Sequence, residues 1–317
     1  MSGIAGQPLH VLIGPTACGK SAVAQYIAER RGAAVLSADA MLIYRGMDIG
    51  TAKPSQAERG SVPYLGVDLA WPDEVFGVWQ YRQAVMAQLA ALPPGQEIIT
   101  VGGSGLYVKA LTDGLDETGP GPAERERWAA LFAAQGVEGL QEALRERDPD
   151  ALAALADARN PRRLIRALER FGGASPSASG ARKADGRDRA DMPVLAGLWI
   201  EPARLNARIA HRVEAMYAAG LLDEVAGLLA SGRALSPTAR QAIGYAEAID
   251  VLEGRCRREV AMERTMTRTR QLAKRQRTWF RHQARVEWVD VKDGDPVDSI
   301  AERVQELWGR YGSARLA

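Results

Sequence analysis

LHVLIGPTACGKS (residues 9–21) is the stretch that decides the fold. Its apolar beginning, residues 9–13, predicts a buried parallel strand, and residues 14–21 directly after it spell GxxxxGKS, the phosphate-binding Walker A pattern. Helical spacing follows, so this glycine-rich turn should lie at a helix N-terminus, where backbone N–H groups attract anions. We expect Lys20 to place a positive charge at the terminal phosphate and the Ser21 hydroxyl to reach a Mg²⁺ ion. The pattern leaves open whether a nucleotide or another diphosphate binds.

The composition bounds the class of protein. With 317 residues, 46% of them hydrophobic, and a net charge of +2, the chain can form one α/β domain plus a smaller unit. No apolar run approaches the ~18 residues of a membrane span, and the N-terminus lacks the features of a signal peptide, so we expect a cytoplasmic protein. Cys18 and Cys256 are isolated, which argues against a disulfide framework or a cysteine-rich zinc site. The three scattered histidines favour structural or surface roles over metal ligation.

Two further strand ends carry polar side chains. Residues 33–37 and 97–101 each predict a buried strand, the first ending near Asp39 and the second at the GGSG turn that contains Ser104. Ligands bind beyond the carboxyl ends of parallel strands, so we expect both side chains near the phosphate loop, with Asp39 placed to act as a base. The alternative is that Asp39 caps a helix over residues 41–44 and Ser104 caps the helix that follows it.

Composition also divides the chain into segments. We expect a first part of the core over residues 1–117, a helical insertion over 118–192 with a mobile loop at 172–191, and completion of the core over 193–317. The first part should also hold a short strand at 67–69.

Two helices of the core are predicted from their spacing. A helix over residues 78–92 should turn Trp79, Val85, Met86 and Leu89 toward the core. A strand over 194–200 should precede a helix over 203–229, in which Arg204, Arg208 and Arg212 form one stripe; one or more of these arginines should reach the phosphate site.

A one-sided run of arginine and lysine marks residues 255–285. Within that stretch only Glu259 and Glu263 oppose the positive charges, and Trp279 and Phe280 stand among the basic residues. A solvated helical face normally mixes both signs, so this pattern favours contact with a polyanion such as nucleic acid.

Taken in order, GPTACGKS, SADAMLIYRGMDIGTAKP, VGGSGLYVKAL, RRLIRALE, RQAIGY and TRQLAKRQRTWFR resemble the tRNA dimethylallyltransferases over residues 9–290. The resemblance implies an α/β fold with a P-loop kinase-like parallel sheet core, an inserted all-helical domain and a basic helical C-terminal third. It implies transfer of a dimethylallyl group from dimethylallyl diphosphate to N6 of the adenosine on the 3′ side of the anticodon, with Mg²⁺ as cofactor. We expect a monomer that binds the anticodon stem-loop of tRNA and no membrane.

The resemblance also assigns roles to individual residues. Asp39, Ser104 and Lys20 match the catalytic positions, with Asp39 as the general base on the adenine amine, and Ser21 matches the metal ligand. The diphosphate site matches Gly14, Pro15, Thr16, Ala17, Cys18, Gly19, Lys20, Ser21 and Arg212. The tRNA contacts match Asp39, Ala40, Met41, Leu42, Ser104, Arg125, Arg162, Arg163, Leu164, Ile165, Arg166, Arg240, Gln241, Ala242, Ile243, Gly244, Tyr245, Lys274, Arg275, Gln276, Arg277 and Arg281.

Several positions depart from the usual pattern of the family. Ser104 replaces threonine but keeps the hydroxyl, so we expect activity to survive. Ala40 replaces serine, Leu42 replaces glutamine, Cys18 replaces serine or alanine, and Arg162 replaces glutamine.

Three alternative functions share part of these features. A P-loop kinase would use Lys20 and Ser21 but gives no reason for the basic helix. A small-nucleotide isopentenyltransferase would share the first three motifs without needing a tRNA-sized surface. A non-catalytic RNA-binding module would not need Asp39 and Ser104 at neighbouring strand ends.

Overall fold

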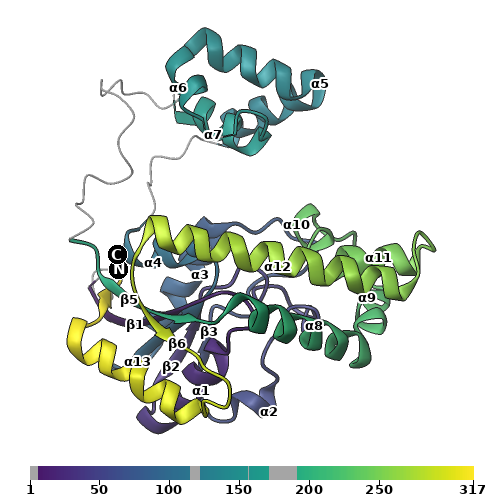
Figure 1. Cartoon of the computed structure of the whole chain (residues 1–317). Helices are drawn as coiled ribbons and strands as arrows, with labels where there is room; N and C mark the ends of the chain where they lie inside the picture. Colours follow the sequence, from purple (N-terminus) through teal and green to yellow (C-terminus); the bar gives the residue numbers. More distant parts are fainter. Residues whose placement is uncertain (1–5, 115–121, 156, 171–190) are drawn as a thin grey trace. The chain divides into compact units, whose positions relative to one another are not determined.

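The computed structural model describes residues 6–114, 122–155, 157–170 and 191–317, and the chain forms two compact units (Figure 1). The first unit comprises Met1–Gly114 and Asp188–Ala317, and the second comprises Leu115–Arg187. From the composition we expected the inserted unit at residues 118–192. Of the expected mobile loop at 172–191, all but Asp191 lies outside the described residues.

The first unit is built on a sheet that has seven strands in the described part of the chain. The order is β3-β2-β4-β1-β5-β6, with β7 beside β1. All pairings along this path are parallel, whereas β7 runs antiparallel to the start of β1. The parallel α/β core is therefore confirmed. The strands are β1 (Pro8–Ile13), β2 (Ala34–Ser37), β3 (Tyr64–Leu65), β4 (Ile98–Gly102), β5 (Val194–Trp199), β6 (Arg285–Asp290) and β7 (Ala314–Arg315).

The central strands are apolar because helices cover both faces of the sheet. Leu12, Leu36 and Ile99 are fully buried, as expected for parallel strands that contact solvent on neither face. The register pairs Ile13 of β1 with Gly102 of β4, so these two strands end side by side. The segments that follow the strands therefore meet at one edge of the sheet.

Helices pack on each face of this sheet. In Figure 1, α1 and α13 lie on one face, and α3, α4 and the long α12 lie on the other. Helix α12 also packs along α8 and α11. The helices of this unit are α1 (Lys20–Arg31), α2 (Gln56–Arg59), α3 (Val78–Ala90), α4 (Gly105–Thr112), α8 (Pro202–Ala218), α9 (Leu221–Ala230), α10 (Pro237–Arg240), α11 (Tyr245–Leu252), α12 (Arg258–Gln283) and α13 (Val297–Tyr311). Among the described helices, none combines the length and apolar character needed to cross a membrane.

The second unit is helical and has its own small core. It contains α5 (Pro122–Arg147), α6 (Pro149–Ala154) and α7 (Pro161–Arg170). Trp128 and Leu140 of α5 pack with Leu164 and Leu168 of α7 in a cluster that is separate from the main core. A separate apolar cluster is what allows a short helical segment to fold as a unit of its own.

Three sequence predictions of local structure were wrong in detail. The short strand forms at Tyr64–Leu65 and not at residues 67–69, because Gly66 and Asp68 have φ of 74° and 54°, which no strand accommodates. The helix over 203–229 is interrupted at Gly220, whose φ is 97°, and forms α8 and α9.

Trp79 also departs from expectation. Its side chain is 52% exposed, whereas Val85 and Leu89 are buried as predicted. At about 100° per residue, Trp79 points away from the face that Tyr81, Val85 and Leu89 share.

Candidate active site

The phosphate loop connects β1 to α1, as the glycine pattern predicts. Ala17 and Gly19 have φ of 64° and 97°, so the backbone passes twice through the left-handed region before α1 begins at Lys20. Such a conformation is strained for an alanine and is found mostly where function requires it. Amides in a turn of this kind, at a helix N-terminus, form an anion-binding nest.

Two polar side chains, Lys20 and Ser21, stand where the loop passes into α1. The Lys20 ammonium donates to the carbonyl oxygen of Pro15, 3.1 Å away, so the positive charge folds over the loop. Ser21, the next residue, is exposed at the first turn of α1. Both side chains are therefore placed to meet an anion on the nest.

A cavity of about 500 Å³ opens beside this loop. Six residues expected from sequence line it: Thr16, Lys20, Ser21, Asp39, Leu42 and Arg212. The rest of the wall consists of Ser37, Thr51, Ala52, Pro54, Tyr64, Val101 and Gly102. The cavity thus combines an anion-binding loop with one carboxylate and one arginine, contributed by separate parts of the chain.

Asp39 follows β2 and faces this cavity. Its Oδ1 accepts a hydrogen bond from the Met41 amide at 2.9 Å, which fixes the carboxylate at the strand end. Residues 41–44 form turns and a bridge instead of a helix, so the alternative that Asp39 caps a helix is wrong.

Ser104 links the ends of β2 and β4. Its hydroxyl oxygen accepts from the Ala40 amide at 3.2 Å, and its own amide donates to the carbonyl of Ala38 at 3.3 Å. Ser104 stands at the first position before α4, yet its side chain makes no capping bond to that helix. The hydroxyl is therefore next to the residue that follows Asp39. It is not among the residues that line the cavity.

Arg212 is the member of the predicted arginine stripe that reaches the cavity. It donates to the carbonyl of Thr51 at 3.1 Å. Burial lowers the pKa of Arg212 below its ordinary value, and the nearby negative charge of Asp39 opposes that shift; the guanidinium stays charged in either case. The other two arginines of the stripe do not line the cavity. Arg208 donates to the Cys18 carbonyl at 3.4 Å, and Arg204 pairs with Asp293 on the surface.

A buried lysine holds the long loop after β2, a role that the sequence did not reveal. The Lys53 ammonium contacts the carbonyl of Tyr44 at 2.6 Å and the carboxylates of Asp48 and Asp68 at 2.7 Å each. Glu224 of α9 fixes the same loop by accepting from the amides of residues 48 and 49. The loop wall of the cavity is thereby preorganised.

Several residues expected to contact tRNA have buried side chains. Tyr245 is fully buried, and its hydroxyl donates to Glu224; Leu164 belongs to the core of the helical unit. Ala242 and Gly244 are buried, and Gln276 is 8% exposed. These side chains are enclosed by the fold, so a contact of these residues with tRNA stays a prediction. Of the turn at 240–245, Arg240 and Gln241 are exposed.

Three arginines of the second unit have exposed side chains. Arg162, Arg163 and Arg166 are exposed on α7, and Ile165 is partly buried against the helical core. The side chain of Arg125 lies outside the described residues.

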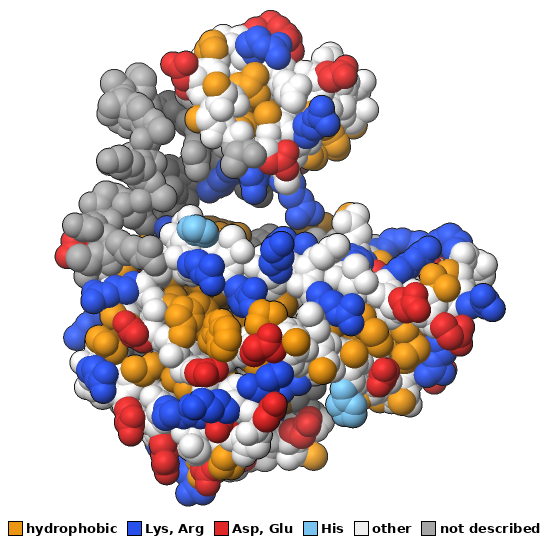
Figure 2. All heavy atoms as spheres, viewed as in Figure 1, with side chains coloured by type: hydrophobic (Ala, Val, Ile, Leu, Met, Phe, Trp, Pro, Cys, Tyr) orange, Lys and Arg blue, Asp and Glu red, His pale blue; other side chains and the backbone are white. Residues whose placement is uncertain are grey.

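The basic helix is α12, and its charges are less isolated than its sequence suggests. Arg268 pairs with Glu247 and Arg264 with Asp250, so α11 supplies acidic partners that the helix itself lacks. In the described part of the chain no ion pair is found for a basic triplet further along α12, Lys274, Arg275 and Arg277. Figure 2 shows Lys and Arg side chains gathered where α12 runs in Figure 1.

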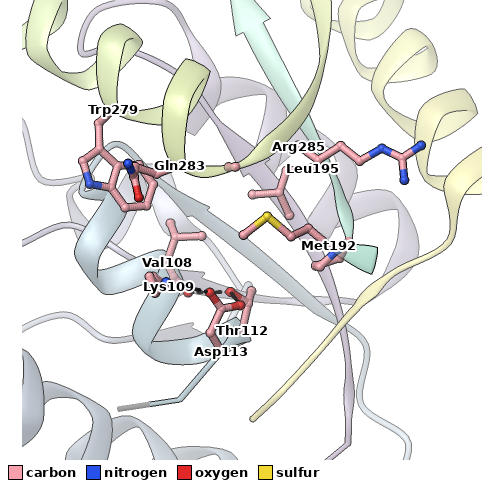
Figure 3. Close-up of a pocket in the computed structure, with 11 residues that line it drawn as sticks. Val108, Lys109, Thr112, Asp113, Met192, Leu195, Trp279, Gln283 and Arg285 are labelled. Carbon is pink, nitrogen blue, oxygen red and sulfur yellow. Dashed lines mark hydrogen bonds and ion pairs between the residues drawn. The ribbon is translucent and has the colours of Figure 1, made fainter. Parts of the chain in front are cut away.

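A second pocket, of about 310 Å³, lies near the ends of the sheet at which β5 and β6 begin (Figure 3). Leu195 and Arg285 line it at the starts of β5 and β6, whereas the phosphate loop follows the end of β1. Figure 3 shows Trp279 of α12 at its wall together with Val108 of α4. None of the loop residues, and not Asp39, is part of this pocket.

The cavity offers oxygen atoms that could ligate Mg²⁺ together with phosphate oxygens. Among the described residues, no cluster of three or more His, Cys, Asp or Glu side chains is suited to hold a metal ion. Mg²⁺ needs no such cluster, since it keeps several waters and is bound by one or two protein oxygens plus phosphate oxygens. The Ser21 hydroxyl lines the cavity and fits that pattern.

Residues 42–283 match the family model described as IPP transferase. The tRNA dimethylallyltransferase of Corynebacterium jeikeium is 39% identical over 299 residues, covering 93% of this chain and 95% of that protein. The enzyme of the same name from Kineococcus radiotolerans is 40% identical, covering 95% of this chain and 96% of that protein.

Solved structures agree with these sequence matches. The tRNA isopentenylpyrophosphate transferase of Bacillus halodurans superposes with a TM-score of 0.68 at 35% identity, covering 96% of this chain and 97% of that one. A eukaryotic dimethylallyltransferase acting on tRNA shares the fold with a TM-score of 0.76, at 22% identity and with coverage of 96% and 79%.

Proposed function

This chain belongs to the IPP transferase family, the tRNA dimethylallyltransferases, and on that basis we propose how its own residues carry out prenyl transfer to tRNA. The substrates are dimethylallyl diphosphate and the adenosine on the 3′ side of the anticodon. The observation that carries the proposal is the shared cavity: the anion nest, Asp39 and Arg212 all face it.

The diphosphate binds on the loop of residues 14–21. Its oxygens accept from the backbone amides of the nest, while Lys20 and Arg212 neutralise the negative charge that grows as the group leaves. Ser21 would hold Mg²⁺, which supplies further charge neutralisation to the same oxygens.

Asp39 acts on the other reactant. The adenine amine is a weak nucleophile, so removing its proton as the bond forms lowers the barrier. The N6–C1 bond forms, the C1–O bond breaks, the diphosphate leaves with the electron pair, and the N6 proton passes to the Asp39 carboxylate. Ser104, held beside Ala40, helps to keep that strand end in place.

The RNA is bound mainly through its phosphates. The target base has to leave its stack to enter the cavity, as in other enzymes that modify a base. We assign backbone contacts to the basic triplet of α12 and to the exposed arginines of α7, each on its own unit.

Mass spectrometry of nucleosides tests this function. The purified chain is incubated with unmodified tRNA and dimethylallyl diphosphate, and the digested tRNA should contain isopentenyladenosine next to the anticodon. Replacing tRNA by AMP tests the small-nucleotide alternative, and replacing the prenyl donor by ATP tests kinase activity. Product formed from AMP at a rate equal to that from tRNA, or phosphate transfer from ATP without prenyl transfer, would contradict the proposal.

A further inference from the structure

Gln276 of α12 reaches across the fold to the phosphate loop. Its Oε1 accepts a hydrogen bond from the Thr16 amide at 2.8 Å, although 260 positions separate the two residues. The side chain is 8% exposed, so this bond lies in an environment where an unpaired amide is costly. Thr16 itself lines the cavity beside Lys20 and Ser21.

The glycines of the GGSG turn make room for α12. A Cβ added to Gly103 would lie 2.4 Å from Nε2 of Gln276 and 3.1 Å from the carbonyl oxygen of Gly14. The carboxamide of Gln276 is therefore held between the phosphate loop and this turn. A side chain larger than hydrogen at Gly103 would displace the carboxamide of Gln276 from its place.

One turn further along α12, a second contact reaches the same region. A Cβ on Gly105 would lie 2.1 Å from the indole of Trp279, so that ring packs directly on the start of α4. Ser104 stands between the two glycines and accepts from the amide of Ala40. Helix α12 thus touches the backbone on both sides of Ser104.

We propose that Gln276 is a positioning residue that sets the geometry of the phosphate loop for the diphosphate. The inference rests on the function proposed above. The bond to Thr16 holds the loop in its anion-binding shape before a ligand arrives, which reduces the ordering that binding would otherwise require. The basic triplet flanks Gln276 on the same helix. In this proposal α12 therefore contacts RNA through the triplet and the phosphate loop through Gln276.

The chemistry of the side chain explains why an amide stands here. A carboxylate at position 276 would still accept from Thr16, but it would place a negative charge beside the diphosphate. A methionine has nearly the same length and no acceptor, and it would leave the Thr16 amide unsatisfied. Gln276→Met therefore tests the loss of the acceptor, and Gln276→Glu tests the added negative charge.

The experiment compares Gln276→Met and Gln276→Glu with Gln271→Met, which changes an exposed glutamine on the same helix. Isothermal titration with inorganic diphosphate measures the loop without requiring catalysis. Kinetics with dimethylallyl diphosphate give KM and kcat, filter binding gives the Kd for tRNA, and thermal melting reports the fold. A wild type that binds diphosphate without prenylating tRNA would contradict the proposed function while leaving the test of Gln276 intact.

For Gln276→Met we expect the Kd for diphosphate and the KM for the prenyl donor to rise about tenfold, with a smaller change in kcat and an unchanged Kd for tRNA. Gln276→Glu should weaken diphosphate binding further, and Gln271→Met should change neither quantity. If Gln276→Met does not fold, Gln276→Ala, which also removes the acceptor for the Thr16 amide and adds no charge, takes its place with the same expected result. Diphosphate binding equal to wild type in the folded variants, or a loss confined to tRNA binding, would overturn the inference.

Discussion

Replacing Asp39 by asparagine isolates the proposed base from the structure that holds it. The Asp39 Oδ1 accepts from the Met41 amide at 2.9 Å, and an asparagine oxygen keeps that hydrogen bond. The cavity wall should therefore retain its shape. Arg212 loses a neighbouring negative charge but remains a cation, because a guanidinium does not deprotonate in proteins.

The expected effect on rate follows from what is removed. A positioned general base contributes about 10²- to 10⁴-fold, or about 2.7–5.4 kcal/mol of transition-state stabilisation. Asp39→Ala also removes the bond to Met41, which adds only about 1 kcal/mol of lost stability. Both variants should therefore fold and bind tRNA, and both should lose most of their turnover.

The assay is single-turnover prenylation at saturating dimethylallyl diphosphate, with the Kd for tRNA measured separately. Asp223→Asn, which changes an exposed carboxylate in the first turn of α9, is the matched control and should react at the wild-type rate. Turnover of Asp39→Asn at the wild-type rate would refute Asp39 as the base.

Three further predictions follow from charge, burial and space. Neutralising the basic triplet together should weaken tRNA binding and reduce the slope of log K against log salt by about 2, and an unchanged slope would remove the triplet from the interface. Burial lowers the pKa of His10 in the folded chain from its ordinary value of 6.5. As pH falls, the imidazole is therefore protonated in the unfolded chain before it is protonated in the folded chain, and the free energy of unfolding should decrease below about pH 6.5. His10→Gln should flatten that part of the pH profile in urea unfolding, whereas a profile identical to wild type would contradict the assignment. Gly102→Ala places a Cβ 2.2 Å from the carbonyl oxygen of Ala38 and should lower the free energy of unfolding by about 2 kcal/mol or more. Gly227→Ala, which has open space around it in α9, should raise the free energy of unfolding by about 0.5–1 kcal/mol. Equal unfolding midpoints for the two variants would refute the packing argument.

The sequence was most informative where local chemistry decides the structure. The Walker A pattern between an apolar run and a helix requires a phosphate loop at a strand end, and it forms at that place. The rule that parallel strands present ligands at their carboxyl ends was enough to bring Asp39 to the same cavity.

Contacts between distant segments were not accessible to the same reasoning. Nothing in the spacing of α12 indicates that Gln276 faces Thr16 while its neighbours face solvent. The acidic partners of the basic helix come from α11, so a count of charges within α12 overstated its free positive charge. The antiparallel strand β7 has only two residues, too few for a periodic pattern, and its pairing with β1 depends on the fold around it.

The most direct test of the account is a structure of the chain with an anticodon stem-loop and an unreactive thio analogue of dimethylallyl diphosphate. We predict that the diphosphate lies on the backbone amides of residues 17–21, and that the adenine N6 lies within about 3.2 Å of an Asp39 carboxylate oxygen. A diphosphate bound elsewhere, or an adenine amine held by another side chain with Asp39 turned toward Met41 alone, would contradict the central claim.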